Sequence, residues 1–221
     1  GGVAGDLNLA ATQPADDNGI ATAIALADLD GDGDLDAFVG TNGANQVLIN
    51  QGGTQGGTAG TFADAAESPE GVVAFTLAVA LGDFDGDGDL DAFIGNAGDA
   101  NQVLINQGGA QGGVAGDFDL AASQPEGGVT NTRDVALVDF DADGDLDVFI
   151  ANFDAADQLL FNQGGAQGGI PGDFDLAPMQ PEDDGYIGSL GVAVGDLDGD
   201  GFIPAVNPNG LPLIDQELLL A

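Results

Sequence analysis

Four acidic segments recur along this sequence at nearly equal intervals, and their spacing limits what the chain can fold into. The first reads Asp-Leu-Asp-Gly-Asp-Gly-Asp-Leu-Asp at residues 28–36, and close copies occupy residues 83–91 and 139–147. A fourth copy begins at Asp196 and departs from the pattern after Gly201. The first aspartates of successive copies are 55, 56 and 57 residues apart. Such a fixed period is typical of repeat architectures, in which each repeat is one supersecondary unit.

A second marker, a Gly-Gly pair, recurs with nearly the same period and sets the boundaries of the units. We interpret residues 1–221 as a single repeat domain and divide it at these pairs into units 1–55, 56–111, 112–167 and 168–221. The last unit is degenerate, because Pro204 stands where the other loops have their final aspartate.

Each unit contains four short segments with strand-like patterns. In the second unit they are residues 61–63, 78–81, 92–94 and 102–106, and the acidic loop joins the second segment to the third. The corresponding second segment of the fourth unit is 191–194. Four short strands in a unit of about 55 residues predict an all-β fold of the β-propeller type, with four four-stranded blades.

The order of the strands indicates how the units join. The sequence starts with a segment, residues 6–9, of the kind that closes a unit, and its last segments are of the kind that open one. In a ring this first strand would complete the last blade. In an open assembly it would complete a blade of a neighbouring molecule by strand addition, which predicts self-association through the terminal strands.

The acidic loops have the composition of a calcium site. Ca²⁺ takes six to eight oxygen ligands at about 2.3–2.6 Å, whereas Mg²⁺ requires a stricter octahedron and more water. Side chains at loop positions 1, 3 and 5 can point into one turn, glycine at position 6 allows the bend, position 7 offers its carbonyl, and position 9 completes the shell. An EF-hand would have glutamate at position 12 between helices. Here position 12 is Val39, Ile94 or Ile150, between predicted strands.

We therefore predict three Ca²⁺ sites in the first three loops. The fourth loop keeps three aspartates, so we expect it to be weaker or differently completed. The candidate metal ligands are Asp28, Asp30, Asp32, Asp34, Asp36, Asp83, Asp85, Asp87, Asp89, Asp91, Asp139, Asp141, Asp143, Asp145, Asp147, Asp196, Asp198 and Asp200.

The charge of the chain excludes several classes of partner. It has 38 Asp and Glu residues against one Lys or Arg, a formal net charge of -37. Such a polyanion is not expected to bind nucleic acid or anionic lipid. No apolar run is long enough to span a bilayer.

The sequence also lacks the usual catalytic side chains. It has no His, Cys or Lys, so the common nucleophile–base pairs are absent, and we predict that the protein is not an enzyme. Carboxylate pairs can hydrolyse glycosides, so a glycan-active enzyme is the remaining catalytic alternative. We expect the single cation, Arg133, to be an exposed residue at a strand edge.

The segment VALGDFDGDGDLDAFIGN at residues 79–96, followed by NQVLINQGG at 101–109, resembles the FG-GAP and VCBS repeats. These occur in the calcium-bearing β-propeller of integrin α-subunits and in many bacterial surface proteins. The resemblance covers all four units and implies four-stranded blades with calcium in the loop between two adjacent strands. Propellers of this family often have seven blades, so a closed four-bladed ring, part of a larger ring and a linear assembly all stay open.

These features predict an extracellular or cell-surface, calcium-stabilised structural protein, a building block of a surface assembly or fibril. The alternative is an adhesion module that binds a protein or glycan when calcium is present. Extracellular calcium modules bind at about 10⁻⁴–10⁻³ M, a concentration that the cytosol does not offer. The near-identical repeats, with no aromatic or basic hot-spot residues in the loops, favour the structural function.

Overall fold

The computed structural model describes residues 19–52, 56–58, 60–66, 69, 71, 73–108, 112–164, 169–170, 172–178, 180–181 and 188–194. These residues form twelve β-strands and no helix. The strands are β1 (Ala21–Ala27), β2 (Asp36–Thr41), β3 (Gln46–Asn50), β4 (Phe62–Asp64), β5 (Thr76–Gly82), β6 (Asp91–Ala100), β7 (Gln102–Asn106), β8 (Phe118–Leu120), β9 (Val129–Val138), β10 (Asp147–Asn152), β11 (Gln158–Asn162) and β12 (Phe174–Leu176). The predicted all-β fold of the propeller type is confirmed.

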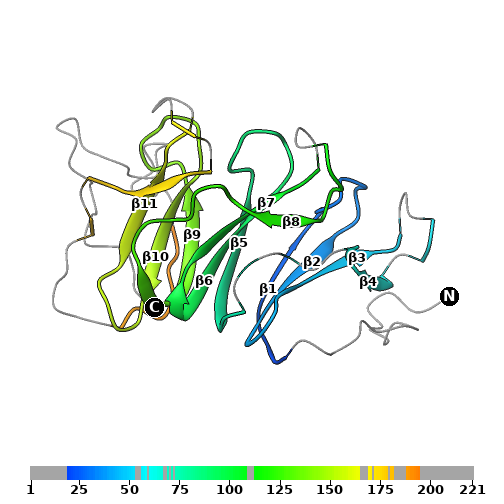
Figure 1. Ribbon diagram of the computed structural model, residues 1–221, viewed down its shortest axis with the longest axis horizontal. Coiled ribbons are helices and arrows are strands. Elements are labelled where there is room, and N and C mark those ends of the chain that lie inside the picture. The colour runs from blue at the N-terminus through cyan, green and yellow to red at the C-terminus, as the bar shows by residue number, and fades with distance from the viewer. Residues whose placement is uncertain are drawn as a thin grey trace.

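The strands form three antiparallel four-stranded blades, which follow one another along the longest axis of the molecule (Figure 1). Blade 1 consists of β1–β4, blade 2 of β5–β8 and blade 3 of β9–β12. The first and second strands of each blade are a hairpin closed by the acidic loop; in blade 1 the last pair before the loop is Ala27 with Asp36. Blades 2 and 3 are also joined edge to edge, because the end of β6 pairs with the start of β9.

The fourth strand of each blade comes from the next unit of the sequence. In blade 1, Asn50 of β3 pairs with Phe62 of β4, across the boundary between the first two units. This confirms that the first strand of a unit closes the preceding blade. The predicted strand at residues 6–9 and the loop at 196–200 lie outside the described residues.

One predicted strand is wrong. Residues 191–194, the expected pre-loop strand of the fourth unit, are not a strand, because no described strand pairs with them as β2 pairs with β1. Val192 and Val194 nevertheless pack on the apolar side of blade 3.

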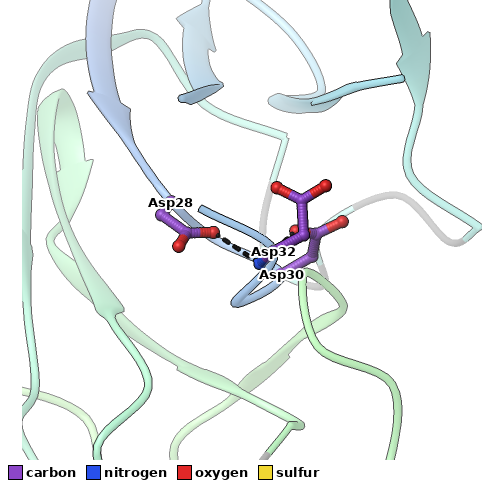
Figure 2. A group of neighbouring side chains, drawn as sticks. All are labelled: Asp28, Asp30 and Asp32. Atoms are coloured by element: carbon purple, nitrogen blue, oxygen red, sulfur yellow. Dashed lines mark hydrogen bonds between the residues drawn. The ribbon is translucent and has the colours of Figure 1, made fainter. Parts of the chain in front are cut away.

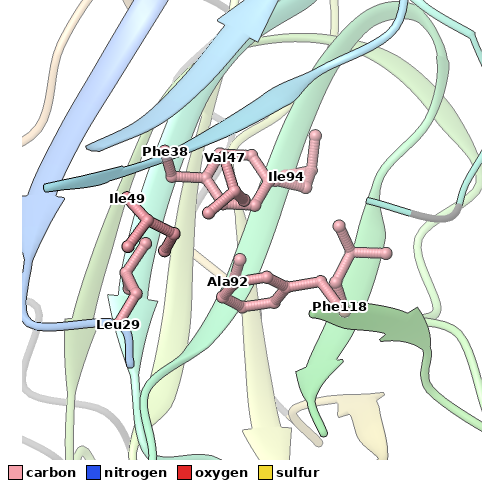
Figure 3. Packing of buried hydrophobic residues seen from close by; sticks show 8 residues of the cluster. Leu29, Phe38, Val47, Ile49, Ala92, Ile94 and Phe118 are labelled. Atoms are coloured by element: carbon pink, nitrogen blue, oxygen red, sulfur yellow. The ribbon is translucent and has the colours of Figure 1, made fainter. Parts of the chain in front are cut away.

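The hydrophobic core lies between the blades. We call the side of a blade that packs on the next blade its forward face, and the side that packs on the preceding blade its back face. The interface between blades 1 and 2 contains Leu29, Phe38, Val47 and Ile49 from the forward face of blade 1, and Ala92, Ile94, Leu104 and Phe118 from the back face of blade 2 (Figure 3).

The same aromatic contact recurs at both interfaces. The rings of Phe38 and Phe118 meet edge to face, with centroids 5.3 Å apart, and their equivalents Phe93 and Phe174 meet in the same way at 5.9 Å. Such pairs contribute about 0.5–1.5 kcal/mol beyond the burial of their surface. The blades are therefore held by side chains at equivalent positions of successive repeats.

A buried asparagine adds one hydrogen bond across each interface. Asn106, at the end of β7, donates from Nδ2 to the backbone oxygen of Leu29 in blade 1 at 2.9 Å. Asn162, at the end of β11, donates to the oxygen of Phe84 in blade 2 at the same distance. Both acceptors are the second residue of an acidic loop, so these bonds fix each loop to the blade that follows it.

Candidate metal sites in the acidic loops

Two residues with positive φ shape each acidic loop. Gly31 and Gly33 have φ values of 77° and 95°, and the second loop repeats this geometry with its two glycines. Glycine adopts this region without steric cost, because it has no Cβ atom. The tight reversal turns the loop back on itself between the first and second strands of the blade.

Backbone N–H groups of the turn hold the carboxylates in place. Asp28 accepts from the backbone N–H of Asp32 at 3.0 Å and from that of Gly33 at 2.9 Å. Asp30 accepts from Asp32 at 3.2 Å, and Asp32 accepts from Asp34 at 2.8 Å. Figure 2 shows the three side chains around the same turn. Because each carboxylate has about four acceptor sites, oxygen lone pairs are left for a cation.

In each loop three carboxylates come close enough to hold one ion. One oxygen of each residue lies within 4.8 Å of the others in the groups Asp28, Asp30 and Asp32; Asp83, Asp85 and Asp91; and Asp139, Asp141 and Asp147. Two oxygens bound to one Ca²⁺ are at most about 5 Å apart, twice the usual bond length. The spread of each group therefore fits a calcium ion.

The comparisons with known proteins agree with this geometry. The family model of the FG-GAP-like repeat matches three overlapping stretches, residues 28–94, 83–150 and 139–203, each running from one acidic loop through the next. The chain belongs to the FG-GAP-like repeat family. It is also 30% identical over 174 residues to cartilage acidic protein 1 of Xenopus tropicalis. The match covers 76% of this chain and 25% of that protein, so the chain spans about a quarter of the relative's length.

The last aspartate of each FG-GAP loop is buried, and we call it the clasp because its carboxylate joins the loop to the third strand. Asp91 accepts from the backbone N–H of Phe84 at 2.8 Å and from that of Asn106 at 2.9 Å, which ties the loop to the third strand. Asp36 and Asp147 make the same two bonds in their own blades. Burial raises the pKa of Asp91 and of Asp147 to about 7, against the lowering effect of the two accepted hydrogen bonds. Burial also raises the pKa of Asp36.

The aspartate at position 7 has an unsatisfied oxygen in all three described FG-GAP loops. Oδ2 of Asp34, of Asp89 and of Asp145 is buried and has no hydrogen-bond partner. A buried carboxylate oxygen without a donor is costly, and a cation in the loop would satisfy it. From the sequence we expected this residue to offer its backbone carbonyl, so its side-chain oxygen is an additional candidate ligand.

Charge repulsion within the loops also favours a cation. Burial raises the pKa of Asp141, and the neighbouring Asp143 and Asp139 raise it further. The pKa of Asp145 is raised by burial and then by charges that include Asp83 of the preceding loop. Carboxylates therefore repel one another both within a loop and between adjacent FG-GAP loops.

Arg133 does not relieve this repulsion. Its guanidinium lies over the ring of Phe153, 4.7 Å from the centroid, and its Nε is buried without a hydrogen-bond partner. The prediction of an exposed strand-edge residue was wrong, because the aromatic ring covers the side chain. No salt bridge joins Arg133 to an FG-GAP loop in the part of the chain that the structure describes.

The structure groups only some of the predicted ligands. Positions 1 and 3 belong to every cluster, while the third member is position 5 in the first FG-GAP loop and position 9 in the other two. Asp87 and Asp143, at position 5, are outside the clusters and accept backbone hydrogen bonds within their turns. Asp196, Asp198 and Asp200 lie outside the described residues. The interblade asparagines were missed, although the sequence repeats an asparagine at the end of each third strand.

Ala142 allows a test of the geometry of the third FG-GAP loop. It has φ of 62°, the only non-glycine with positive φ among the described residues, where the other two loops have Gly31 and Gly86. We expect Ala142→Gly to raise the free energy of unfolding by about 0.5–1 kcal/mol, since an L-residue in this region costs roughly 1–2 kcal/mol. Gly86→Ala should lower it by a similar amount, because its new Cβ would meet nothing within 4 Å and would add only backbone strain.

Urea denaturation of the two variants with calcium in excess measures both effects. Equal stability of Ala142→Gly and the wild type would show that the third loop does not need the left-handed conformation.

Proposed function

We propose that this chain is a calcium-stabilised structural unit of an extracellular or cell-surface assembly. The observation that carries this proposal is the carboxylate cluster that recurs in the same hairpin loop of three consecutive blades. Carboxylate and carbonyl oxygens in a flexible loop are the ligands that Ca²⁺ prefers. In each site the carboxylates at positions 1, 3, 5 and 9 and the residue at position 7 would supply the oxygens.

In this proposal the ion has a structural role. It would neutralise the carboxylates that crowd the loop, and it would hold the first strand of a blade to the second. Because the loop also accepts the asparagine bond from the next blade, ordering one loop orders the interface beside it. The ions would thus stabilise a row of blades whose acidic surface otherwise repels itself.

The extracellular location is proposed from the family and from the calcium concentration that such loops need, which the cytosol does not offer. FG-GAP repeats are typical of extracellular proteins with structural or adhesive functions. The part of the chain that the structure describes has no helix that is long and apolar enough to cross a membrane.

A second candidate function, adhesion, is favoured by exposed apolar side chains near the ends of the blades opposite the acidic loops. Ile20 and Phe75 directly precede β1 and β5, and Val129 begins β9; their exposed fractions are 70%, 45% and 65%. Phe153, which follows β10, is 44% exposed. Exposed apolar residues that gather on one side of a protein are typical of binding surfaces. In this alternative the ions would stiffen a module that binds a protein or glycan.

Titration calorimetry tests the metal sites. We expect at least three Ca²⁺ ions per chain, with dissociation constants of roughly 10⁻⁴–10⁻³ M, and weaker binding of Mg²⁺. The control variant carries Asp28→Asn, Asp83→Asn and Asp139→Asn, because asparagine keeps one of the two acceptor oxygens that the turn uses and removes one charge from each site. It should bind calcium much more weakly. Fewer than three ions in the wild type, or equal binding of Mg²⁺, would contradict the proposal.

A further inference from the structure

A continuous network of buried hydrogen bonds joins the described acidic loops. The clasp of the first loop, Asp36, accepts from the backbone N–H of Leu29 at 2.8 Å. The backbone oxygen of Leu29 accepts from Nδ2 of Asn106 in blade 2, at 2.9 Å. The backbone N–H of Asn106 in turn donates to the clasp of the second loop, Asp91, at 2.9 Å. One asparagine therefore links the clasps of two loops.

The same bonds lead from the second loop to the third. Asp91 accepts from the backbone N–H of Phe84 at 2.8 Å, and the oxygen of Phe84 accepts from Nδ2 of Asn162 at 2.9 Å. The backbone N–H of Asn162 donates to the third clasp, Asp147, at 3.0 Å. We call the whole series the interblade network; it consists of Asp36, Leu29, Asn106, Asp91, Phe84, Asn162 and Asp147.

Burial makes this network sensitive to the loss of any one bond. Each of its residues is at most 2% exposed, so water does not replace a missing partner. A buried polar group without a partner is costly, and hydrogen bonds in a low-dielectric interior are stronger than in water. We therefore expect the groups of the network to become ordered together.

The network includes candidate metal ligands. Asp91 and Asp147 belong both to the network and to the carboxylate clusters of their loops, and Leu29 lies in the sequence between two cluster members, Asp28 and Asp30. A cation that holds the carboxylates of one loop would thus also fix the backbone oxygen to which the asparagine of the next blade donates. That asparagine holds a candidate ligand of the next loop.

We propose that Asn106 and Asn162 couple the metal sites, so that Ca²⁺ in one loop raises the calcium affinity of the loop in the next blade. The inference rests on the proposed function, in which the loops bind Ca²⁺, and adds how the sites depend on one another. Coupling of this kind needs no large movement, because the order that the first ion imposes does not have to be imposed again by the second. By linkage, the effect is the same in both directions.

Charge acts in the opposite direction, so the sign of the coupling is informative. Two bound cations repel one another, and an ion in one loop reduces the negative potential at its neighbour. Electrostatics alone therefore predicts that filling one loop weakens calcium binding by the next. The interblade network predicts that filling one loop strengthens it.

Blade 1 offers a matched control. Asn50 is the equivalent of Asn106, and its backbone N–H donates to the clasp of its own loop in the same way. Its Nδ2 donates to the oxygen of Leu35 at 3.2 Å, as that of Asn106 donates to the oxygen of Leu90 at 3.2 Å. Among the described residues, Asn50 makes no hydrogen bond to another blade. Asn50→Ala therefore removes the same local bonds as Asn106→Ala and leaves the bonds between the described blades intact.

Hydrogen exchange, measured by mass spectrometry over a calcium titration of the full chain, gives a midpoint for each loop. The turn N–H groups report on their own loop, because Gly33 donates to Asp28 and Gly88 donates to Asp83. The first loop is disabled with Asp28→Asn and Asp30→Asn. These leave it a formal charge of -3, the charge that its five aspartates have with one Ca²⁺ bound, so the charge near the second loop is matched. We expect the midpoint of the second loop to rise roughly fivefold or more.

The asparagine variants show whether this effect passes through the interblade network. With Asn106→Ala, disabling the first loop should change the midpoint of the second by less than about twofold. Asn50→Ala should keep the full effect, and so should Asn162→Ala, which breaks only the link between the second and third loops. Asn106→Ser fills more of the site and provides the same comparison if the alanine variant does not fold in calcium, which circular dichroism checks.

Two results would overturn the inference while leaving the proposed function intact: no effect of the disabled first loop in the wild type, or an equal effect with and without the Nδ2 donor of Asn106. In both cases the loops would still gain protection from calcium. Loops that gain no protection at any calcium concentration would overturn the inference and the proposed function together.

Discussion

Removing calcium with EGTA should lower the melting temperature of this protein by roughly 15 °C or more. A ligand that binds only the folded state adds about 2.7 kcal/mol per site at a hundredfold excess over its dissociation constant, and three described loops have a suitable cluster. For a chain of 150–250 residues each kcal/mol corresponds to about 2–4 °C. Chelation also restores the full charge repulsion between the loops, which adds to the loss of stability. Differential scanning calorimetry in calcium and in EGTA measures the change.

The control for this experiment separates calcium at the loops from a general effect of ionic strength. The variant with Asp28→Asn, Asp83→Asn and Asp139→Asn should melt at nearly the same temperature in calcium and in EGTA. Magnesium at the same concentration should restore less stability to the wild type than calcium does. If chelation leaves the melting temperature of the wild type unchanged, the FG-GAP loops of this chain do not hold a stabilising ion.

Removing the buried carboxylate of Asp91 in blade 2 should strongly destabilise the fold. We expect Asp91→Ala to lower the free energy of unfolding by about 3 kcal/mol or more, in EGTA as well as in calcium. The reason is that the N–H groups of Phe84 and Asn106 lose their buried acceptor, at a cost of about 1–3 kcal/mol each. Urea denaturation measured in both conditions gives the two values.

Asp119→Ala is the matched control for the clasp. Asp119 is an exposed carboxylate on β8 of the same blade, so its removal should leave stability unchanged or raise it slightly by reducing the net negative charge. Asp91→Asn should lie between the two, because its amide oxygen can accept one of the two bonds. A loss of stability in Asp91→Ala that appears only with calcium would show that Asp91 acts as a metal ligand and not as a clasp.

Much of the fold could be read from the spacing of a few residue types. The predicted strands at 46–50 and 102–106 coincide with β3 and β7, because each apolar run is bounded by turn residues. The acidic hairpin loop was predicted correctly between two strands, since its glycines permit the positive φ values that the turn uses. The strand predicted at residues 191–194 was wrong. A strand forms only if a neighbouring strand supplies its hydrogen bonds, and the sequence pattern of one segment does not show which segment lies beside it.

In the candidate sites, too, some features follow from the sequence and others only from the fold. The sequence identifies every aspartate of a loop as a possible ligand, but the same residue type has three environments in the fold. Asp28 is a half-buried member of a cluster, Asp34 has a buried oxygen without a donor, and Asp36 accepts two backbone hydrogen bonds. These differences come from burial and from the third strand, which is distant in sequence and adjacent only after folding.

By itself the sequence determined the period, the four-strand unit and the acidic loop, because these depend on local spacing and on the chemistry of oxygen ligands. Only the tertiary structure decided which carboxylates converge, how each loop is tied to the next blade, and which blade face is left open. Those features depend on contacts between successive repeats. Leu26 and Leu81 occupy the same position in near-identical segments, yet Leu81 is packed on a core and Leu26 is exposed, because only blade 2 has a described blade before it.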